Sequence, residues 1–287
     1  MTFSVVGRDP TTGDLGIAVQ SKFLAVGAVV PWARADAGAI ATQSWANTAY
    51  GPDGLNLLAN GASAEEALAR LTSGDADPSQ RQVGIVDAQG RSATYTGPGC
   101  YPWAGGIAGP NFAAQGNILV GAETVAALAE TFQSATGPLW HRLVAALAAG
   151  QRAGGDSRGQ QSAALLVVRA KGGYGGFNDR LLDLRVDDHP QPIAELARLV
   201  DLFELYFLKP TPDDYLPIDV ALATELQQLL TRSGDYSGPL TGAYDAATYA
   251  ALERYGAREN LEERLLHDPN DPRLDRIVLA FMRQHIR

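Results

Sequence analysis

Short apolar runs separated by turn-forming residues dominate the chain up to residue 45. Runs at 3–7 and 15–19 flank a turn-rich segment at 9–14, and two more runs follow at 26–32 and 38–42. Runs of this length, bounded by Gly, Pro, Asp and Thr, are typical of β-strands. Because they follow one another too closely for crossover helices, we expect the strands to pair antiparallel.

From residue 50 to residue 186 the pattern alternates between helical and extended periods. Apolar residues at 139, 143, 146 and 147 have the spacing of a helix packed on one face. This order of segments predicts an α+β fold with helices layered on antiparallel sheets, which a four-layer αββα sandwich accommodates. The predicted helices are 52–58, 63–71, 123–133 and 139–149, and the predicted strands are 82–87, 92–96, 113–120, 162–169 and 181–186.

A change in composition at 187–190 ends this region. A long helix is predicted at 192–208, and the segment 209–214, with two prolines and two aspartates, is typical of a linker. The chain is therefore expected to contain two domains, an α+β domain at 1–208 and a small all-α domain at 209–287. The helices predicted in the second domain are 220–232, 245–255, 261–266 and 273–284.

The composition is that of a folded protein without the charge pattern of a nucleic-acid or membrane-surface protein. The chain has 287 residues, 46% of them apolar, and a net charge of −9, whereas nucleic acids and anionic membranes attract basic patches. No run of eighteen uncharged apolar residues occurs, and Arg8 and Asp9 stand where a signal peptide needs an apolar centre. We therefore expect a cytoplasmic protein with no nucleic-acid partner and no membrane partner.

The sequence carries no motif for a metal, a disulfide or a phosphate group. Cys100 is the single cysteine, and the four histidines lack metal-binding spacing. The glycine-rich segment 172–177 lacks the residue order of a phosphate-binding loop. Since no basic group lies near it in the sequence, Cys100 is interpreted as a packed, unreactive thiol. We expect no metal and no cofactor.

Thr2 has the most distinctive chemistry because it follows Met1 directly. Removal of Met1 would place a hydroxyl and a free α-amine on one residue. An α-amine with a pKa of about 8 can accept the hydroxyl proton near neutral pH, so this residue would carry a nucleophile and its own base. The alternative interpretation is that Thr2 merely begins an edge strand.

Five separated segments resemble one known bacterial family, in the same order along the chain. They are Met1–Ser4, Ala18–Ala28, Ala41–Asn47, Gln115–Leu119 and Gly154–Leu165. Together they closely resemble DUF1028, a family of unknown function that is grouped with the N-terminal nucleophile (Ntn) hydrolases, over about residues 1–208. The resemblance implies an αββα sandwich and cleavage of an amide bond, and it supplies no substrate.

In the superfamily that this resemblance implies, an N-terminal Thr, Ser or Cys attacks an amide carbonyl, and Thr2 has that position. Ser21 and Lys22 follow the second predicted strand, where polar residues approach the nucleophile, and a lysine there would lower the proton affinity of the amine. Asp156, in the turn 155–159, resembles the aspartate that orients the N-terminal residue. The alternatives are a solvated strand end for Lys22 and an ordinary turn for Asp156.

An amide hydrolase also needs hydrogen-bond donors for the oxyanion that forms during the attack. We expect Asn47 and Asn117 to serve, together with backbone N–H groups around Gln43 and Ser44, while Ser21 completes the substrate-binding set. Asn47 stands just before a predicted helix, so capping of that helix is its alternative role.

The C-terminal region resembles a second family. Segments 226–230, 234–238 and 242–252 are similar to three-helix peptidoglycan-binding-like modules, over about residues 211–285. This resemblance implies a glycan partner for the region. Because the sequence shows no export signal, docking to another protein and dimerisation are the alternatives.

Three functional hypotheses remain open on the sequence. The first is an N-terminal threonine hydrolase that cleaves a small-molecule or peptide amide. The second is a non-catalytic protein that keeps the sandwich and binds a small ligand near Ser21, Lys22 and Asn117. The third is an assembly subunit, forming a homo-oligomer through its C-terminal helices.

Overall fold

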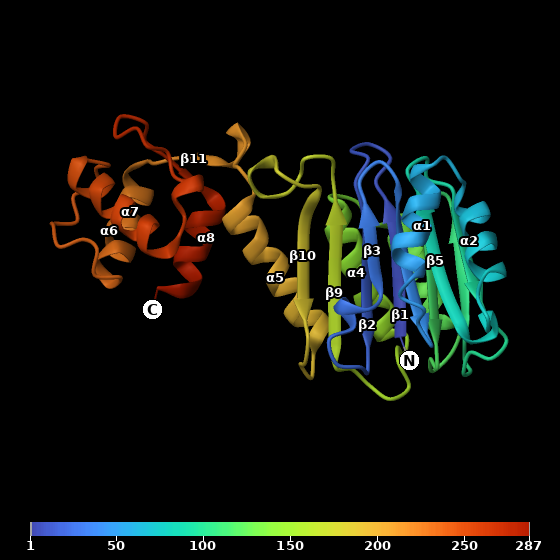
Figure 1. The fold of residues 1–287 in the computed structure, drawn as a ribbon. Coiled ribbons are helices and arrows are strands. Elements are labelled where there is room, and N and C mark those ends of the chain that lie inside the picture. Colours follow the sequence, from blue (N-terminus) through green and yellow to red (C-terminus); the bar gives the residue numbers. More distant parts are fainter. Residues whose placement is uncertain (1, 287) are drawn as a thin grey trace. The chain divides into compact units, whose positions relative to one another are not determined.

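The computed structural model describes residues 2–286, and Figure 1 shows their fold. The chain divides into two compact units, Met1–Val200 and Asp201–Arg287. The division falls inside helix α5 (Pro192–Phe207). Residues 192–200 of α5 belong to the first unit, where Ile193, Leu196 and Val200 are buried, and residues 201–207 belong to the second.

The larger sheet of the first unit has six strands in the order β10-β9-β2-β1-β8-β7, and all neighbours are antiparallel. The continuous apolar run of β9 is fully buried, as expected for a strand covered on both faces. Strand β1 lies between β2 and β8 and is therefore a central strand. The bounds are β1 (Thr2–Arg8), β2 (Leu15–Ser21), β7 (Gly105–Gly109), β8 (Phe112–Asn117), β9 (Ser162–Val168) and β10 (Arg180–Val186).

The second sheet of this unit has four antiparallel strands in the order β3-β4-β5-β6. Its strands are β3 (Pro31–Arg34), β4 (Gly38–Ser44), β5 (Arg81–Asp87) and β6 (Ser92–Thr96). Strands β1 and β2 contact β4 across the space between the sheets, and β5 contacts β8. Buried side chains of both sheets fill part of this space. We call this set the apolar cluster: Val6, Leu15, Ile17, Val19, Val26, Val30, Ala39, Ala41, Val86, Ala113, Ala164, Leu166 and Val168.

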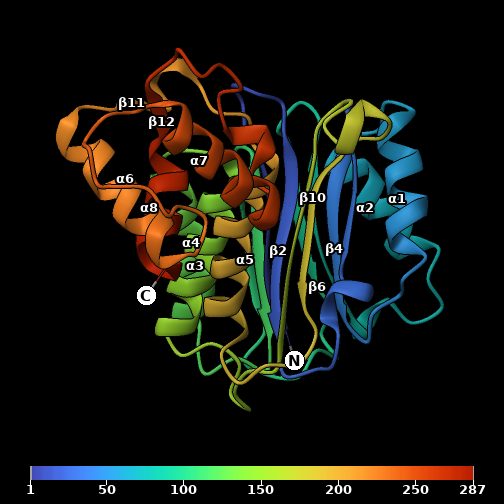
Figure 2. The same cartoon turned by 90° about the vertical axis from the view of Figure 1, so that its left-hand side faces the viewer.

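Helices cover the outer faces of both sheets. Helices α1 (Tyr50–Ala59) and α2 (Ala64–Ser73) contact the four-stranded sheet, whereas α3 (Glu123–Ser134) and α4 (Leu139–Arg152) contact the six-stranded sheet. Figure 2 shows α3 and α4 on one side, α1 and α2 on the other, and the strands between them. Ser63 caps α2, because its Oγ accepts a hydrogen bond from the backbone N–H of Glu66. The prediction of a mixed α/β fold with antiparallel sheets is confirmed.

Two predicted segments of the first unit differ in the structure. The run at 26–32 begins as a short 3-10 helix (Val26–Ala28), and strand β3 starts only at Pro31. Ala25, at φ 53°, breaks the extended conformation before that turn. The segment 97–110, rich in glycine and proline, carries no strand pattern in the sequence, but it contains edge strand β7. A Cβ at Gly106 would lie against the side chain of Thr94, so the glycine permits this close approach.

The second unit consists of helices around one core. Helices α6 (Val220–Arg232), α7 (Ala246–Glu259) and α8 (Arg276–His285) surround buried side chains that include Leu226, Leu252 and Val278. The predicted helical character of this region is confirmed in outline, but a purely helical description is wrong. Strands β11 (Tyr215–Pro217) and β12 (Arg273–Asp275) form a short antiparallel pair. Three-residue strands are too short to give a recognisable period in the sequence.

Candidate functional site

Most residues expected at the site lie at one end of the sandwich. Strand β1 begins at Thr2, whereas β2 ends at Ser21 and β8 ends at Asn117. The register places Thr2 directly opposite Asn117. In the facing sheet β4 ends with Gln43 and Ser44. We call this the Thr2 end, and it is the end at which Figure 1 marks the N-terminus.

Thr2 joins both sheets through its own atoms. Its side chain is 6% exposed, and its Oγ1 lies 3.0 Å from Ser21 Oγ. Its carbonyl oxygen accepts a hydrogen bond of 3.2 Å from Gln43 Nε2 in the facing sheet. The structure therefore brings together three of the expected residues, Thr2, Ser21 and Gln43, with Asn117 on the neighbouring strand. Thr2 begins a central strand, and the alternative of an edge strand is wrong.

Four buried amide side chains surround this point, and we call them the amide cluster: Gln43, Gln82, Gln115 and Asn117. Each is at most 1% exposed. Gln82 Oε1 accepts from Gln43 Nε2 and from Asn117 Nδ2, both at 2.8 Å. Ser4 Oγ donates to Gln43 Oε1 and accepts from Gln115 Nε2, both at 2.7 Å. The cluster thus forms a hydrogen-bonded network between the sheets beside Thr2.

The sequence analysis missed Gln82, Gln115 and Ser4. A signal was present, because each is a polar residue inside a short strand-like run whose other members are mostly apolar or small. A Cβ at Gly84, two residues after Gln82, would overlap the side chain of Gln115. This glycine leaves the room that a second buried glutamine needs.

Asp156 lies in a turn that hydrogen bonds connect to the Thr2 end. Its side chain is buried, with Oδ2 accepting the backbone N–H of Lys22 at 3.0 Å and Oδ1 accepting that of Arg158 at 2.9 Å. Ser157 N–H donates to the carbonyl of Ile118, just after β8. The Lys22 side chain is exposed, and its Nζ donates to Gln160 O at 3.3 Å. Lys22 therefore contacts Asp156 through its backbone.

Asn47 and Ser44 have other surroundings. Asn47 Nδ2 donates to Asp75 Oδ2 at 2.9 Å, and its Oδ1 accepts from the backbone N–H of Ala49 at 3.1 Å. The second bond closes a local turn just before α1. Ala49 is the N-cap of α1 and no described side chain caps this helix, so the alternative role of Asn47 as a helix cap is wrong. Ser44 is half-buried, with φ at 70°, and its pairing partner is Arg81 at the start of β5.

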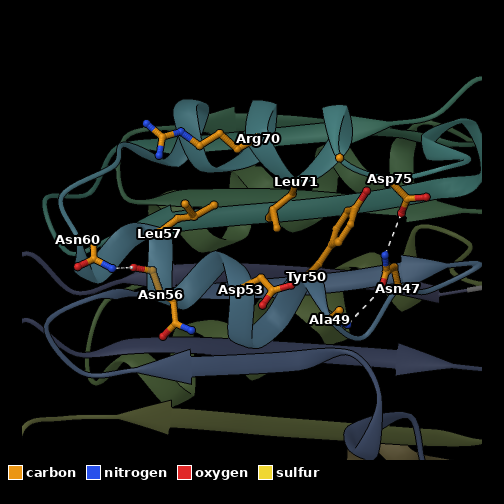
Figure 3. A pocket seen from close by; sticks show the side chains of 11 residues that line it. Asn47, Ala49, Tyr50, Asp53, Asn56, Leu57, Asn60, Arg70, Leu71 and Asp75 are labelled. Carbon is orange, nitrogen blue, oxygen red and sulfur yellow. Dashed lines mark hydrogen bonds between the residues drawn. The ribbon is translucent and has the colours of Figure 1, made fainter.

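A pocket of about 430 Å³ opens between α1 and α2. Figure 3 shows that the Tyr50 hydroxyl points toward Asp75 at one end of this pocket. Asp75 accepts two hydrogen bonds from the Arg81 guanidinium, which holds the pKa of this carboxyl well below its usual value. Burial and the neighbouring Asp75 raise the pKa of Tyr50. The pocket is lined by Asn47, Ala49, Tyr50, Asp53, Asn56, Leu57, Asn60, Arg70, Leu71, Gly74 and Asp75.

Other chemistry is sparse in the part of the chain that the structure describes. Residues 2–286 contain no group of three or more His, Cys, Asp or Glu side chains that could hold a metal ion. Within the same range, no helix combines the length and the apolar character needed to cross a lipid bilayer. Cys100 is buried, and its Sγ donates to Arg81 O at 3.4 Å.

Comparison with known proteins places this geometry in a family. Residues 2–196 match the family model described as "Family of unknown function (DUF1028)". The chain belongs to the DUF1028 family. A solved DUF1028 structure, protein SPO2555 from Silicibacter pomeroyi, is 32% identical and superposes with a TM-score of 0.65. The match covers 71% of this DUF1028 chain and 86% of that one.

The C-terminal region has its own match. Residues 206–282 match the family model described as "Putative peptidoglycan binding domain". A search of curated proteins gives no significant match to this DUF1028 chain. The comparisons thus show the family and a second module, and they leave the activity to be argued from the site.

Proposed function

We propose that this DUF1028 chain is an N-terminal threonine hydrolase of the Ntn type, which cleaves a small-molecule or peptide amide after removal of Met1. The observation that carries the proposal is the place of Thr2. It is the first residue of a central strand, its hydroxyl lies 3.0 Å from Ser21 Oγ, and the buried amide cluster, which both sheets contribute, lies beside it. A mobile terminus would not hold a nucleophile in this way.

The proposed reaction uses atoms of Thr2 as both nucleophile and base. Thr2 Oγ1 attacks the amide carbonyl carbon while the α-amine accepts the hydroxyl proton. Collapse of the tetrahedral intermediate breaks the C–N bond, the proton passes to the leaving amine, and the acyl group remains on Thr2 as an ester. Water then attacks this ester and gives a proton to the amine. The bond between Oγ1 and the acyl carbon breaks, that proton passes to Oγ1, and the carboxylic acid is released with Thr2 restored.

Neighbouring groups support each charge in this scheme. Each Asp156 oxygen accepts a backbone N–H and retains a further lone pair, so the carboxylate can also accept from the ammonium formed on Thr2. The Lys22 ammonium donates to Gln160 O, so the part of Lys22 that acts in this proposal is its backbone N–H, which anchors Asp156. Replacement of Lys22 by alanine would preserve that anchor.

The test needs no knowledge of the substrate. Intact mass of protein purified from its own host should show a chain that begins at Thr2. A β-lactone, whose ring ester acylates a nucleophilic hydroxyl, should then add one acyl group to the Thr2 peptide. Thr2→Ser should retain the adduct, whereas Thr2→Ala and a variant with glycine fused before Thr2 should lose it. Retention of Met1 in mature protein, or an unmodified Thr2, would overturn the proposal.

The α1–α2 pocket favours a second candidate, a non-catalytic role in binding a small polar ligand. Its lining offers carboxylates and amides such as Asp53, Asn56 and Asn60, with Arg70 as a cation. Ligand-induced thermal stabilisation that survives Thr2→Ala but is lost in Asp53→Ala would support this role. Equal stabilisation of both variants and the wild type would argue against it.

For the C-terminal region we propose binding of a peptidoglycan-type glycan, supported by the family match of residues 206–282. Cosedimentation of the full chain with purified cell-wall sacculi would test it. A chain that ends at residue 208 is the control, and equal sedimentation of the two proteins would contradict the proposal.

A further inference from the structure

We propose that Gln82 is a positioning residue that turns the Asn117 amide so that one of its N–H groups serves the oxyanion at Thr2. This inference rests on the proposed function, which it deepens by naming the oxyanion donor and the group that holds it. Gln82 lies on β5, in the sheet that faces Thr2, and its side chain is fully buried.

The surroundings of Gln82 fix the orientation of its amide group. Its Nε2 lies 2.7 Å from Gly116 O, 3.2 Å from Gly105 O and 3.0 Å from Thr96 Oγ1. Backbone carbonyls can only accept, so the atom that faces them must be the amide nitrogen. A flipped amide would bring its oxygen against two carbonyl oxygens, with no hydrogen between them. Gln82 Oε1 therefore points away from these carbonyls, toward Gln43 and Asn117.

This orientation determines how Gln43 and Asn117 point. Gln82 Oε1 is an acceptor, so both neighbours present their NH2 groups to it at 2.8 Å. Gln43 Nε2 also donates to Thr2 O, which uses both of its hydrogens. Within residues 2–286, Asn117 Nδ2 makes only the bond to Gln82, so one of its N–H groups remains available.

The available N–H of Asn117 lies close enough to Thr2 to serve as an oxyanion donor. Asn117 is the register partner of Thr2 on the adjacent strand, and side chains of directly opposed residues lie about 5 Å apart at Cβ. The Gln43 side chain has no hydrogen left to donate, so it is not a second donor for the oxyanion. Asn47 donates to Asp75 in the α1–α2 pocket. Among the expected amide side chains, Asn117 is the donor that the network leaves free to act.

A double-mutant cycle on the full chain tests whether Gln82 acts through Asn117. The rate of Thr2 acylation by a β-lactone should fall about 100-fold in Asn117→Ala, as expected for loss of one oxyanion donor. Gln82→Met should slow it at least about tenfold, and should slow it no further in the Asn117→Ala background. Gln20→Met, the same substitution at a fully buried glutamine on the opposite face of β2 from Ser21, is the matched control and should react within about twofold of wild type.

A conservative variant keeps the test interpretable if Gln82→Met fails to fold. Gln82→Glu, kept neutral by burial, retains a carbonyl for Asn117 and an O–H for a backbone carbonyl, so it should react nearly as fast as wild type. Its rate should fall as rising pH ionises the new carboxyl, since a carboxylate has no donor. Equal losses in Gln82→Met and Gln20→Met, or additive losses in the double mutant, would overturn the inference.

A second readout separates this inference from the proposed function. In the 15N side-chain amide spectrum, the Asn117 NH2 pair, assigned by its loss in Asn117→Ala, should shift and exchange faster in Gln82→Met than in Gln20→Met. If wild-type Thr2 reacts with no β-lactone, the proposed function fails and the catalytic part of the inference fails with it. An unchanged Asn117 signal in Gln82→Met would refute the positioning role even if Thr2 does react.

Discussion

The space between the two sheets has two halves with opposite chemistry, although the same strands cross both. One half holds the apolar cluster, and the half at the Thr2 end holds the amide cluster. Along β1 the side chains that face the other sheet change from Val6 to Ser4 and Thr2, and along β5 they change from Val86 to Gln82. The comparison shows that only one half is built as an ordinary core.

The energetic difference between the halves points to a reason other than stability for the amide cluster. Burial of apolar surface contributes about 25 cal/mol per Å². A buried hydrogen bond contributes little net energy, and a buried polar atom without a partner costs about 1–3 kcal/mol. Within residues 2–286, Gln115 Oε1 is such an atom. Val and Leu side chains in the same place would stabilise this end more. The presence of amides here is therefore better explained by a functional site than by stability.

The largest expected loss of stability comes from the apolar half. Ile17 is fully buried in the apolar cluster, and Ile17→Ala would remove three carbons and leave a cavity. We expect the free energy of unfolding to fall by about 2–5 kcal/mol, measured by urea denaturation. β-Lactone acylation of the folded variant should match wild type, because the substitution spares the Thr2 end. A large drop in the acylation rate would contradict the proposal that the apolar half and the Thr2 end have separate roles.

In the amide half the expected loss of stability is smaller. Ser4→Ala would remove the hydroxyl that donates to Gln43 Oε1 and accepts from Gln115 Nε2. We expect a loss of about 1–3 kcal/mol, from the buried partners left unpaired. Ser73→Ala, at an exposed helix end, is the control and should change little. Combined with Gln115→Met, Ser4→Ala should cost less than the sum of the two single changes.

The apolar half was predictable from the sequence, whereas the amide half was predictable only in part. Runs such as Leu15–Val19 and 82–87 carry the period and composition of strands, so the sheets, the covering helices and their order could be expected. Glycine hid β7, because Gly105, Gly106 and Gly109 give no side-chain pattern. The register of the strands decides which polar residues meet, and it depends on contacts between segments more than 100 residues apart.

Some residues of the site could be predicted from their chemical type and motif, and the others were found only in the structure. Thr2, Ser21, Asn117 and Gln43 could be named from motifs, and the structure brings them together at one end. The side chains of Lys22 and Asn47 make their hydrogen bonds away from Thr2: Lys22 donates to Gln160 O, and Asn47 donates to Asp75. The rotamer decides which partner such a side chain reaches, and the sequence does not show the rotamer. Gln82 escaped notice because a single glutamine in a strand has no motif.

A charged pair borders the amide half and should make this end sensitive to acid. Arg81 precedes Gln82 on β5 and holds the pKa of Asp75 below its usual value of 3.8. A depressed pKa contributes stability at neutral pH that is lost as pH falls below about 4 toward the folded-state value. The difference in unfolding free energy between wild type and Asp75→Asn should therefore shrink between pH 5 and pH 2.5.

Urea denaturation across this pH range measures the effect. Asp53→Asn, at an exposed carboxylate in the same pocket, is the control and should follow the wild-type curve. A constant difference between wild type and Asp75→Asn over the whole range would mean that the Asp75–Arg81 pair contributes no pH-dependent stability.

The smallest expected effect on stability concerns exposed aromatic residues at the two ends of the sandwich. Phe23 is 52% exposed and follows Ser21 by two residues, whereas Tyr174 is 86% exposed and lies in the loop between β9 and β10, at the opposite end. Phe23→Ser and Tyr174→Ser should each change the unfolding free energy by less than about 0.5 kcal/mol.

Reactivity should nevertheless distinguish these two substitutions. If the chemistry belongs to the Thr2 end, Phe23→Ser should slow acylation by a β-lactone with a long alkyl chain more than acylation by a short-chain analogue, because the exposed ring offers apolar contact to the chain. Tyr174→Ser should leave the ratio of the two rates unchanged. Equal ratios in both variants would show that Phe23 does not contact bound substrate, and a change in Tyr174→Ser alone would move the site to the other end.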